Sequence, residues 1–429
     1  MAEQTSTPAN QEPQQQQSSQ AAPKPNPNYV APAKTPVYKA LKGVYFDFNH
    51  GARVVVTEEA DKAYRIVILD ADSMATLYSG VLNKGGIVRT NKTYYTRYRL
   101  LIYDPDDKSG KPIFDHLMNL KGMPVLVQLS GTAIGDNIGW FSYIERFQQK
   151  FGADVHVYMA QHVAELFKKQ YPSIKFLTKE ETQAFTQKAY ASYWLGLFFK
   201  NNTNQQPYDF RYVGLHKTAG YILGLRTQEE LADIPPRVDL SAKRTIKGKY
   251  AVIAVQASSK AKQWNNPGGW RKVVKQLTDN GYRVLCIDKA AEQCFELSSN
   301  CIPHGCEDFT GDIPLQERIN IIKDADVFIG MSSGLAWLAW CCKVPVVLIS
   351  GFTDPYNEFY TPYRVQNTQV CHGCWHGLQD EFSHTDYFWC PRKEKNSEKF
   401  ECTRMITPVM VLHAVNAALQ SKKAKSKRK

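Results

Sequence analysis

The feature that most constrains this fold is an alternation of short apolar runs with helical patterns. The run MPVLVQLS at residues 123–130 is apolar without interruption, as in a parallel strand buried on both faces. A glycine-rich turn and a helical pattern follow it, and the sequence then returns to another apolar run. This alternation predicts a doubly wound α/β fold.

Two such series follow one another along the chain. The predicted strands lie at residues 123–130, 154–160 and 173–178 in the first series and at residues 250–257, 282–289, 326–331 and 344–350 in the second. A linker with a Pro pair and mixed charges, residues 226–249, separates them. We therefore expect two Rossmann-like domains, 111–245 and 246–420, that face a cleft. Ligands of open α/β sheets bind beyond the carboxyl ends of the strands, so the turns there are the candidate sites.

The segments outside the two α/β series differ from them in composition. Residues 1–36 are rich in Gln and Pro, which predicts a disordered leader. Residues 37–110 contain short runs rich in Val, Ile, Tyr and Thr, which predict a small antiparallel β domain. Residues 421–429 form a basic tail that we expect to be solvated and disordered.

The net positive charge of the chain does not by itself indicate a nucleic-acid-binding protein. The net charge is +12, but the last nine residues contain six Lys or Arg. We find no nucleic-acid-binding motif, so no specific nucleic-acid partner is expected. There is no secretory signal and no run of about 18 apolar residues. These observations predict a cytoplasmic protein without a transmembrane segment.

The first glycine-bearing turn, residues 131–139, carries Asp136 where the next helix is expected to begin. One interpretation is an N-cap, since Asp is favoured where the first N–H groups of a helix lack partners. The other is a general base, because a carboxylate facing the cleft can accept a proton from an acceptor hydroxyl. The sequence alone leaves both interpretations open.

The second turn, residues 256–267, and the third turn, residues 330–335, follow strands of the second series and are candidates for binding a phosphorylated donor. The candidate donor-binding residues are Gln256, Ser258, Ser259, Lys262, Trp264, Lys289, Ser332, Ser333, Gly334 and Leu335. Hydroxyls, lysines and backbone N–H groups at the start of a helix suit a diphosphate. The alternatives are a solvated loop and a plain tight turn. Neither a Walker loop nor a GxGxxG fingerprint is present.

Four cysteines near the end of the chain give the strongest local signal. Cys371 and Cys374 form a CxxC pair, and Cys390 and Cys402 follow at longer spacings. In a cytoplasmic protein this pattern is typical of a closed, structural thiolate site for zinc or iron. Free thiols, or disulfides in an extracellular protein, remain the alternatives.

In their order, the three turns resemble those of the heptosyltransferase family of GT-B glycosyltransferases, over residues 120–360. The matching segments are Gly135-Asp136, Ser258-Ser259 with Lys262 and Trp264, Ser332-Ser333-Gly334-Leu335, Pro345-Val346-Val347 and Phe352-Thr353-Asp354-Pro355. The resemblance implies that Asp136 is the base of an inverting transfer and that the second and third turns hold the donor diphosphate. Two departures stand out: Ser332 replaces an Asp of the family, and the Pro after Lys-x-Trp is displaced to Pro267.

Together with the β-rich segment and the cysteine pattern, residues 37–415 resemble the bacterial autotransporter heptosyltransferases. That resemblance implies ADP-heptose as donor, Ser or Thr hydroxyls of an autotransporter passenger as acceptor, iron in the four-cysteine site and a dodecameric ring. The residues themselves favour zinc. Two other functions stay open: a lipopolysaccharide-type heptosyltransferase acting on a lipid-linked sugar, and a non-enzymatic metal-finger scaffold or RNA-binding protein.

Overall fold

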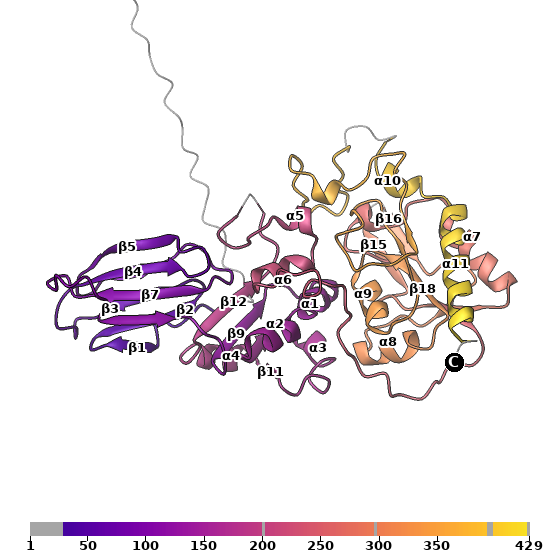
Figure 1. Ribbon diagram of the computed structural model, residues 1–429. Helices are drawn as coiled ribbons and strands as arrows, with labels where there is room; N and C mark the ends of the chain where they lie inside the picture. Colours follow the sequence, from indigo (N-terminus) through magenta and orange to yellow (C-terminus); the bar gives the residue numbers. More distant parts are fainter. Residues whose placement is uncertain (1–28, 200–201, 296–297, 393–397, 427–429) are drawn as a thin grey trace, which may run out of the picture.

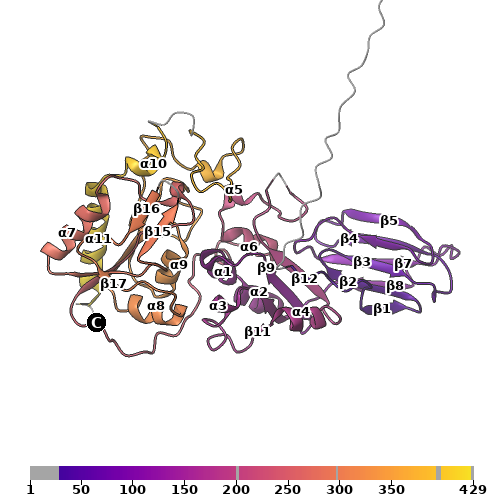
Figure 2. The same ribbon diagram turned by 180° about the vertical axis from the view of Figure 1, so that it is seen from behind.

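The computed structural model describes residues 29–199, 202–295, 298–392 and 398–426. Figure 1 shows two α/β halves side by side, with the N-terminal strands extending the first half away from the second. The view from behind shows the same row of three parts (Figure 2). The predicted α/β class with a β-rich N-terminal region is therefore confirmed.

The first half is built on an eight-stranded sheet with the order β11-β10-β9-β12-β2-β3-β6, to whose β2 the strand β1 is added. Its strands are β1 (Tyr38–Leu41), β2 (Val44–Asn49), β3 (Arg53–Val56), β6 (Ile87–Arg89), β9 (Pro124–Leu129), β10 (Asp154–Tyr158), β11 (Lys175–Phe176) and β12 (Ala191–Leu195). Pairing is parallel from β11 to β2 and antiparallel beyond. The helices of this half are α1 (Ile134–Phe141), α2 (Ile144–Phe151), α3 (Gln161–Ala164), α4 (Lys179–Phe185), α5 (Phe210–Val213) and α6 (Lys217–Ile222).

The N-terminal strands form the β-rich region that the sequence predicted, and they also join the sheet of the first half. Strand β2 pairs in parallel with β12, so the parallel sheet of the first half continues into the N-terminal region. A second, four-stranded antiparallel sheet has the order β5-β4-β7-β8. It contains β4 (Tyr64–Asp70), β5 (Thr76–Leu82), β7 (Tyr98–Tyr103) and β8 (Phe114–Leu117), so the β region also extends beyond residue 110.

The predicted leader ends earlier than expected. The backbone N–H of Val30 donates to Oε1 of Gln128 at 3.0 Å, and Nε2 of Gln128 donates back to the Val30 carbonyl at 2.9 Å. Tyr29 packs against Trp194, with ring centroids 4.8 Å apart. The prediction of disorder over residues 29–36 is therefore wrong, because these residues satisfy buried polar groups of the first sheet. Residues 1–28 lie outside the described part of the chain.

The second half has a wholly parallel sheet with the order β17-β14-β13-β18-β19-β20. Its strands are β13 (Tyr250–Ala254), β14 (Arg283–Cys286), β17 (Glu307–Asp308), β18 (Val327–Met331), β19 (Val346–Ile349) and β20 (Arg364–Val365), and a hairpin of β15 (Glu292–Phe295) and β16 (Ser298–Cys301) stands apart from it. The helices are η1 (Lys260–Lys262), α7 (Gly269–Asp279), α8 (Leu315–Ile322), α9 (Gly334–Cys341), η2 (Cys374–His376), α10 (Glu401–Arg404) and α11 (Pro408–Ser426). Every residue of β13 and β18 is buried, as expected for strands covered on both faces.

The basic tail is largely part of α11, which packs against α7 and the second sheet. The side chain of Lys422 lies 3.2 Å from the Asp326 carboxylate. The predicted disorder is therefore wrong for residues 421–426, while residues 427–429 lie outside the described chain. In the described ranges, no helix combines the length and apolar character needed to span a membrane.

The two halves touch where α1 meets α9. A Cβ on Gly135 would lie 2.8 Å from the ring of Trp337, and a Cβ on Gly334 would lie 2.8 Å from the Cβ of Ile134. Both distances are too short for a side chain, so the two glycines permit the helix starts to approach each other. This contact brings the first turn of the first half next to the third turn of the second half.

Candidate active site

The candidate site lies where the strand order reverses in both sheets. β9 lies between β10 and β12, and β13 lies between β14 and β18, so the chain leaves each strand in opposite directions on its two sides. Such switch points open a crevice at the carboxyl ends of the strands. A pocket of about 450 Å³ occupies this position and is lined by residues of both halves.

Asp136 lines this pocket from the first turn of α1. The N-cap of α1 is Ala133, so Asp136 does not occupy the N-cap position that the sequence left open. Among the interactions of the described residues, no hydrogen bond holds its carboxylate. Burial raises the pKa of Asp136 to about 6, and the positive charge of Lys262 opposes that rise. A partly buried carboxylate with a raised pKa is suited to accept a proton near neutral pH.

Lys262 lines the opposite wall, at the end of η1. Its Nζ lies 3.5 Å from Oγ of Ser258, which also lines the pocket. Burial lowers the pKa of Lys262, while the charges of Asp136 and Glu358 raise it. The pocket therefore places a carboxylate and an ammonium on facing walls without a direct ion pair between them.

The rest of the second turn divides into pocket-lining and supporting residues. Gln256 of this turn lines the pocket, as does Lys289, which follows β14. Ser259 is buried, and its Oγ accepts the N–H of Ala261, which shapes η1 rather than facing the pocket. The indole N–H of Trp264 donates to the Ile406 carbonyl at 2.9 Å, so Trp264 lies in the core of the second half.

The third turn contributes all four of its predicted residues, Ser332 through Leu335, to the pocket lining. Ser333 is the N-cap of α9, yet its side chain caps no backbone N–H. Within the described chain, the buried Ser333 hydroxyl has no hydrogen-bond partner. A helix start together with such a hydroxyl suits an anionic ligand oxygen.

Sequence reasoning missed Glu358, which also lines the pocket although it is only 2% exposed. Arg364 pairs with it at 2.7 Å, Nδ2 of Asn357 donates to it at 3.0 Å, and the Ser332 hydroxyl donates to it as well. Burial raises the pKa of Glu358, but these partners outweigh burial and hold it below its usual value. A carboxylate thus lies behind Ser332, where the resembling family has an Asp in the turn itself. Glu358 lies three residues after the Phe352–Pro355 segment on which the family resemblance partly rests. This closeness was the signal that the sequence offered for Glu358.

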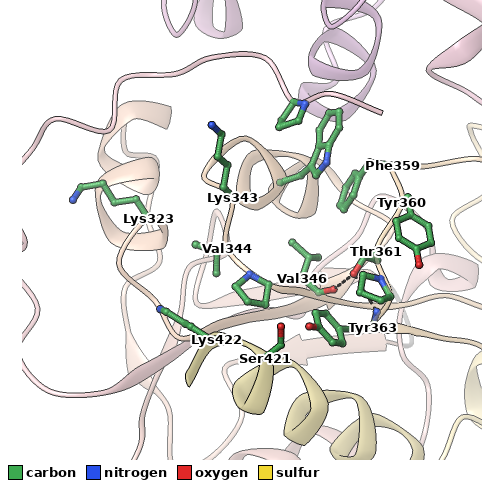
Figure 3. Close-up of a pocket in the computed structure, with 14 residues that line it drawn as sticks. Lys323, Lys343, Val344, Val346, Phe359, Tyr360, Thr361, Tyr363, Ser421 and Lys422 are labelled. Atoms are coloured by element: carbon green, nitrogen blue, oxygen red, sulfur yellow. Dashed lines mark hydrogen bonds between the residues drawn. The ribbon is translucent and has the colours of Figure 1, made fainter. Parts of the chain in front are cut away.

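A larger cavity, of about 580 Å³, lies at the amino-terminal end of strand β19. Figure 3 shows Lys323, Lys343 and Lys422 on one side of it and the rings of Phe359 and Tyr363 on the other. No residue predicted for the site lines this cavity. The smaller pocket therefore remains the candidate active site.

The four cysteines come together beside the second half, from the loop after β20, η2 and α10. Cys402 and Cys371 share a hydrogen bond, which lowers the pKa of Cys371 and raises that of Cys402. The charges of Cys374 and Cys390 also raise the pKa of Cys402, so all four thiols influence one another. All four are free thiols. In the described residues, however, no three potential ligands are placed as a bound metal ion would require.

One mixed and one parallel sheet face this pocket, with a carboxylate on one wall and a lysine, hydroxyls and the start of α9 on the other, an arrangement expected of a glycosyltransferase of the GT-B type. Comparison with known proteins agrees. The model of glycosyltransferase family 9 (heptosyltransferase) matches residues 195–387, and that of the N-terminal domain of glycosyltransferase TibC matches residues 41–106.

Full-length relatives make the assignment more specific. The chain is 44% identical to the autotransporter heptosyltransferase Aah of Escherichia coli over 88% of this chain and 94% of that protein. It matches the crystal structure of the iron-containing dodecameric glycosyltransferase TibC from enterotoxigenic E. coli with a TM-score of 0.86 and 42% identity, over 92% of this chain and all of that one. A complex of TibC with ADP-D-β-D-heptose matches with a TM-score of 0.85. The chain belongs to the autotransporter heptosyltransferases.

Proposed function

We propose that this enzyme transfers heptose from ADP-heptose to Ser or Thr hydroxyls of an autotransporter passenger, with inversion at the anomeric carbon. The observation that carries the proposal is the pair of facing walls, with Asp136 and Lys262 on opposite sides of one pocket. Family membership and the ADP-heptose complex of TibC support the choice of donor.

In this mechanism the acceptor hydroxyl oxygen attacks the anomeric carbon of the heptose. The proton of the hydroxyl passes to the Asp136 carboxylate, which is about nine-tenths ionised at pH 7 for a pKa near 6. The bond between the anomeric carbon and the β-phosphate oxygen breaks, and ADP leaves with the bonding pair. Attack from the face opposite the leaving group inverts the configuration.

The second half stabilises the leaving group. The ammonium of Lys262, the hydroxyl of Ser258 and the N–H groups at the start of α9 offer positive charge and donors to the diphosphate. Such groups act most strongly where charge develops in the transition state. The Ser333 hydroxyl gains a partner when a phosphate oxygen arrives.

The four-cysteine segment is proposed to hold iron in a structural role. Thiolates are soft ligands that suit iron or zinc, and the hydrogen bond between Cys371 and Cys402 places two of the four side chains next to each other. The iron-containing relative favours iron over zinc. Cys371, Cys374, Cys390 and Cys402 would hold the ion and tie the loop after β20 to α10. The same relative supports a dodecamer, and cytoplasmic location stays a prediction.

The test is transfer to a passenger protein by purified enzyme with ADP-heptose as donor. Intact-mass analysis of the passenger should show increments of one heptose per modified site, and none with the Asp136→Asn variant. Anomeric configuration, read by NMR of the glycopeptide, tests inversion. If only a lipid-linked sugar is modified, the assigned acceptor is wrong.

A further inference from the structure

The ammonium of Lys262 lies over three aromatic rings. Its Nζ is 5.7 Å from the ring centroid of Phe352, 5.9 Å from that of Trp375 and 5.7 Å from that of Phe382. A cation within about 6 Å of a ring centroid is attracted by the negative face of the ring. We call these three rings the aromatic box.

The rings of the box support one another. The ring centroids are 5.5 Å apart for Phe352 and Trp375, 5.1 Å for Phe352 and Phe382, and 5.4 Å for Trp375 and Phe382. All three belong to one buried cluster, to which Trp389 also contributes. Each ring is therefore fixed by contact with the other two, at distances typical of favourable aromatic pairs.

Backbone contacts fix the box to the second sheet. The N–H of Trp375 donates to the Phe352 carbonyl at 3.1 Å, and the N–H of Gly373 donates to the Gly351 carbonyl at 2.8 Å. Gly373 has φ of +67°, and a Cβ there would lie 2.6 Å from the Asp354 carboxylate. The CxxC segment is thus joined to the strand end of β19 and carries one wall of the box.

The box holds a cation without cancelling its charge. In the described chain, the only hydrogen-bond partner of the Lys262 ammonium is the Ser258 hydroxyl. A carboxylate partner would compete with an arriving diphosphate, whereas ring faces attract the ammonium and leave its charge available. Phe352 and Trp375 also line the pocket, so the aromatic box forms part of the pocket wall beside Lys262.

We propose that the aromatic box is a positioning element of the donor site, which holds the Lys262 ammonium where it meets the donor diphosphate. The cysteine-bearing segment is then part of the donor site through Trp375 and Phe382. This inference rests on the proposed function of Lys262. The rings act through the Lys262 ammonium.

A double-mutant cycle tests the inference. Phe382→Leu keeps apolar volume but removes a ring face, and Lys262→Met removes the charge from a chain of similar length. Calorimetry gives the dissociation constants of ADP and AMP for the wild type, both single variants and the double variant. We expect Phe382→Leu to weaken ADP binding about 5- to 10-fold, in line with a cation–π contact that is shielded from water. In the Lys262→Met background the same change should have little further effect.

Matched variants separate positioning from general packing. Phe382→Tyr retains the ring face and should restore ADP affinity, and Phe388→Leu removes a nearby ring that lies over Lys399 instead. AMP lacks the second phosphate, so Phe382→Leu should lower the affinity for AMP less than the affinity for ADP. Metal content and circular dichroism should match the wild type. Should Phe382→Leu not fold, Trp375→Phe against Trp375→Leu gives the same comparison.

Two outcomes of these measurements would contradict different parts of the argument. Equal losses of ADP affinity from Phe382→Leu in both backgrounds would overturn the inference, because the ring would then act independently of Lys262. Unchanged ADP affinity in Lys262→Met would instead contradict the proposed role of Lys262 itself.

Discussion

Each wall of the pocket contains one carboxylate, and the surroundings shift the pKa values of the two in opposite directions. Asp136, on the first half, has no hydrogen-bond partner among the described residues, and burial raises its pKa to about 6. Glu358, on the second half, is more deeply buried, yet Arg364, Ser332 and Asn357 hold its pKa below the usual value. Burial alone therefore does not decide the role of a carboxylate. A buried carboxylate without partners is suited to act as a base, whereas a buried carboxylate with an arginine and hydrogen-bond donors beside it is suited to stay charged.

The substitution Asp136→Asn tests the difference between the two carboxylates with the largest expected effect. The amide keeps the shape but cannot accept the proton, so we expect the transfer rate to fall about 10³-fold, within the usual range for a general base. The measurement is the initial rate of passenger modification at saturating ADP-heptose. ADP affinity serves as the control and should change little. A variant that retains more than a tenth of the wild-type rate would show that Asp136 is not the base.

Glu358→Gln should instead act on stability. It leaves Arg364 in a buried position without its charge partner, at a cost of about 3 kcal/mol. Because the pKa of Glu358 is lowered by folding, its contribution is present above its unfolded pKa and is lost as pH falls through the folded value. Urea unfolding at pH 7 and pH 4 should show a difference from the wild type that is largest at pH 7 and smaller at pH 4, where the unfolded state begins to bind the proton. Equal differences at both values would mean that the charge of Glu358 is not the cause.

The same unfolding measurement on Asp136→Asn should give the opposite sign. Folding raises the pKa of Asp136, so the ionised carboxylate costs stability at every pH above the folded value of about 6. Its replacement should raise the free energy of unfolding at pH 7 by on the order of 1–2 kcal/mol, allowing for partial exposure. The gain should disappear below about pH 3.5, where both proteins are neutral at this position. A loss of stability at pH 7 would contradict the unpaired state of Asp136.

The pH dependence of transfer sharpens the assignment further. With a base whose pKa is about 6, kcat/KM should fall tenfold for each unit of pH below that value and level off above it. Glu358, whose pKa is low, should add no break between pH 5 and pH 8. The profile is measured with donor and acceptor both below their KM values. A break near pH 4 would indicate an ordinary, exposed carboxylate.

Lys289 should give the smallest effect. It lines the pocket, but its side chain is 77% exposed and lies 3.6 Å from an exposed carboxylate of Asp312. Exposed charges contribute little, so Lys289→Ala should weaken ADP binding by no more than about threefold. Calorimetry at low and high salt checks this. A loss comparable to that of Lys262→Met would place Lys289 on the diphosphate.

The parts of the site that the sequence predicted share one property: each lies in a turn directly after a buried strand. The apolar runs fix where β9, β13 and β18 end, and the rule for open α/β sheets then brings Asp136, Lys262 and Ser332 to one crevice. Trp264 and Ser259 lie in the same turn but point into the core and the loop. Local sequence does not determine which side chains of an irregular turn face the ligand.

Glu358 and the aromatic box could not be predicted in this way. Phe352, Trp375 and Phe382 come from loops without periodicity, and only tertiary packing brings them to Lys262. The pairing of the N-terminal strands with the first sheet could not be predicted from the sequence either. Strand β12, which makes the connection, escaped the sequence analysis, and the pairing of β2 with β12 spans more than 140 residues. Contacts at such separations leave no local pattern.

That joined sheet has a mechanical consequence. Because main-chain hydrogen bonds run without a break from β2 through β12 to β9, the N-terminal strands and the strand that precedes Asp136 form one rigid plate. A displacement of the N-terminal strands is therefore passed through the sheet to the turn that carries Asp136, so the two move together.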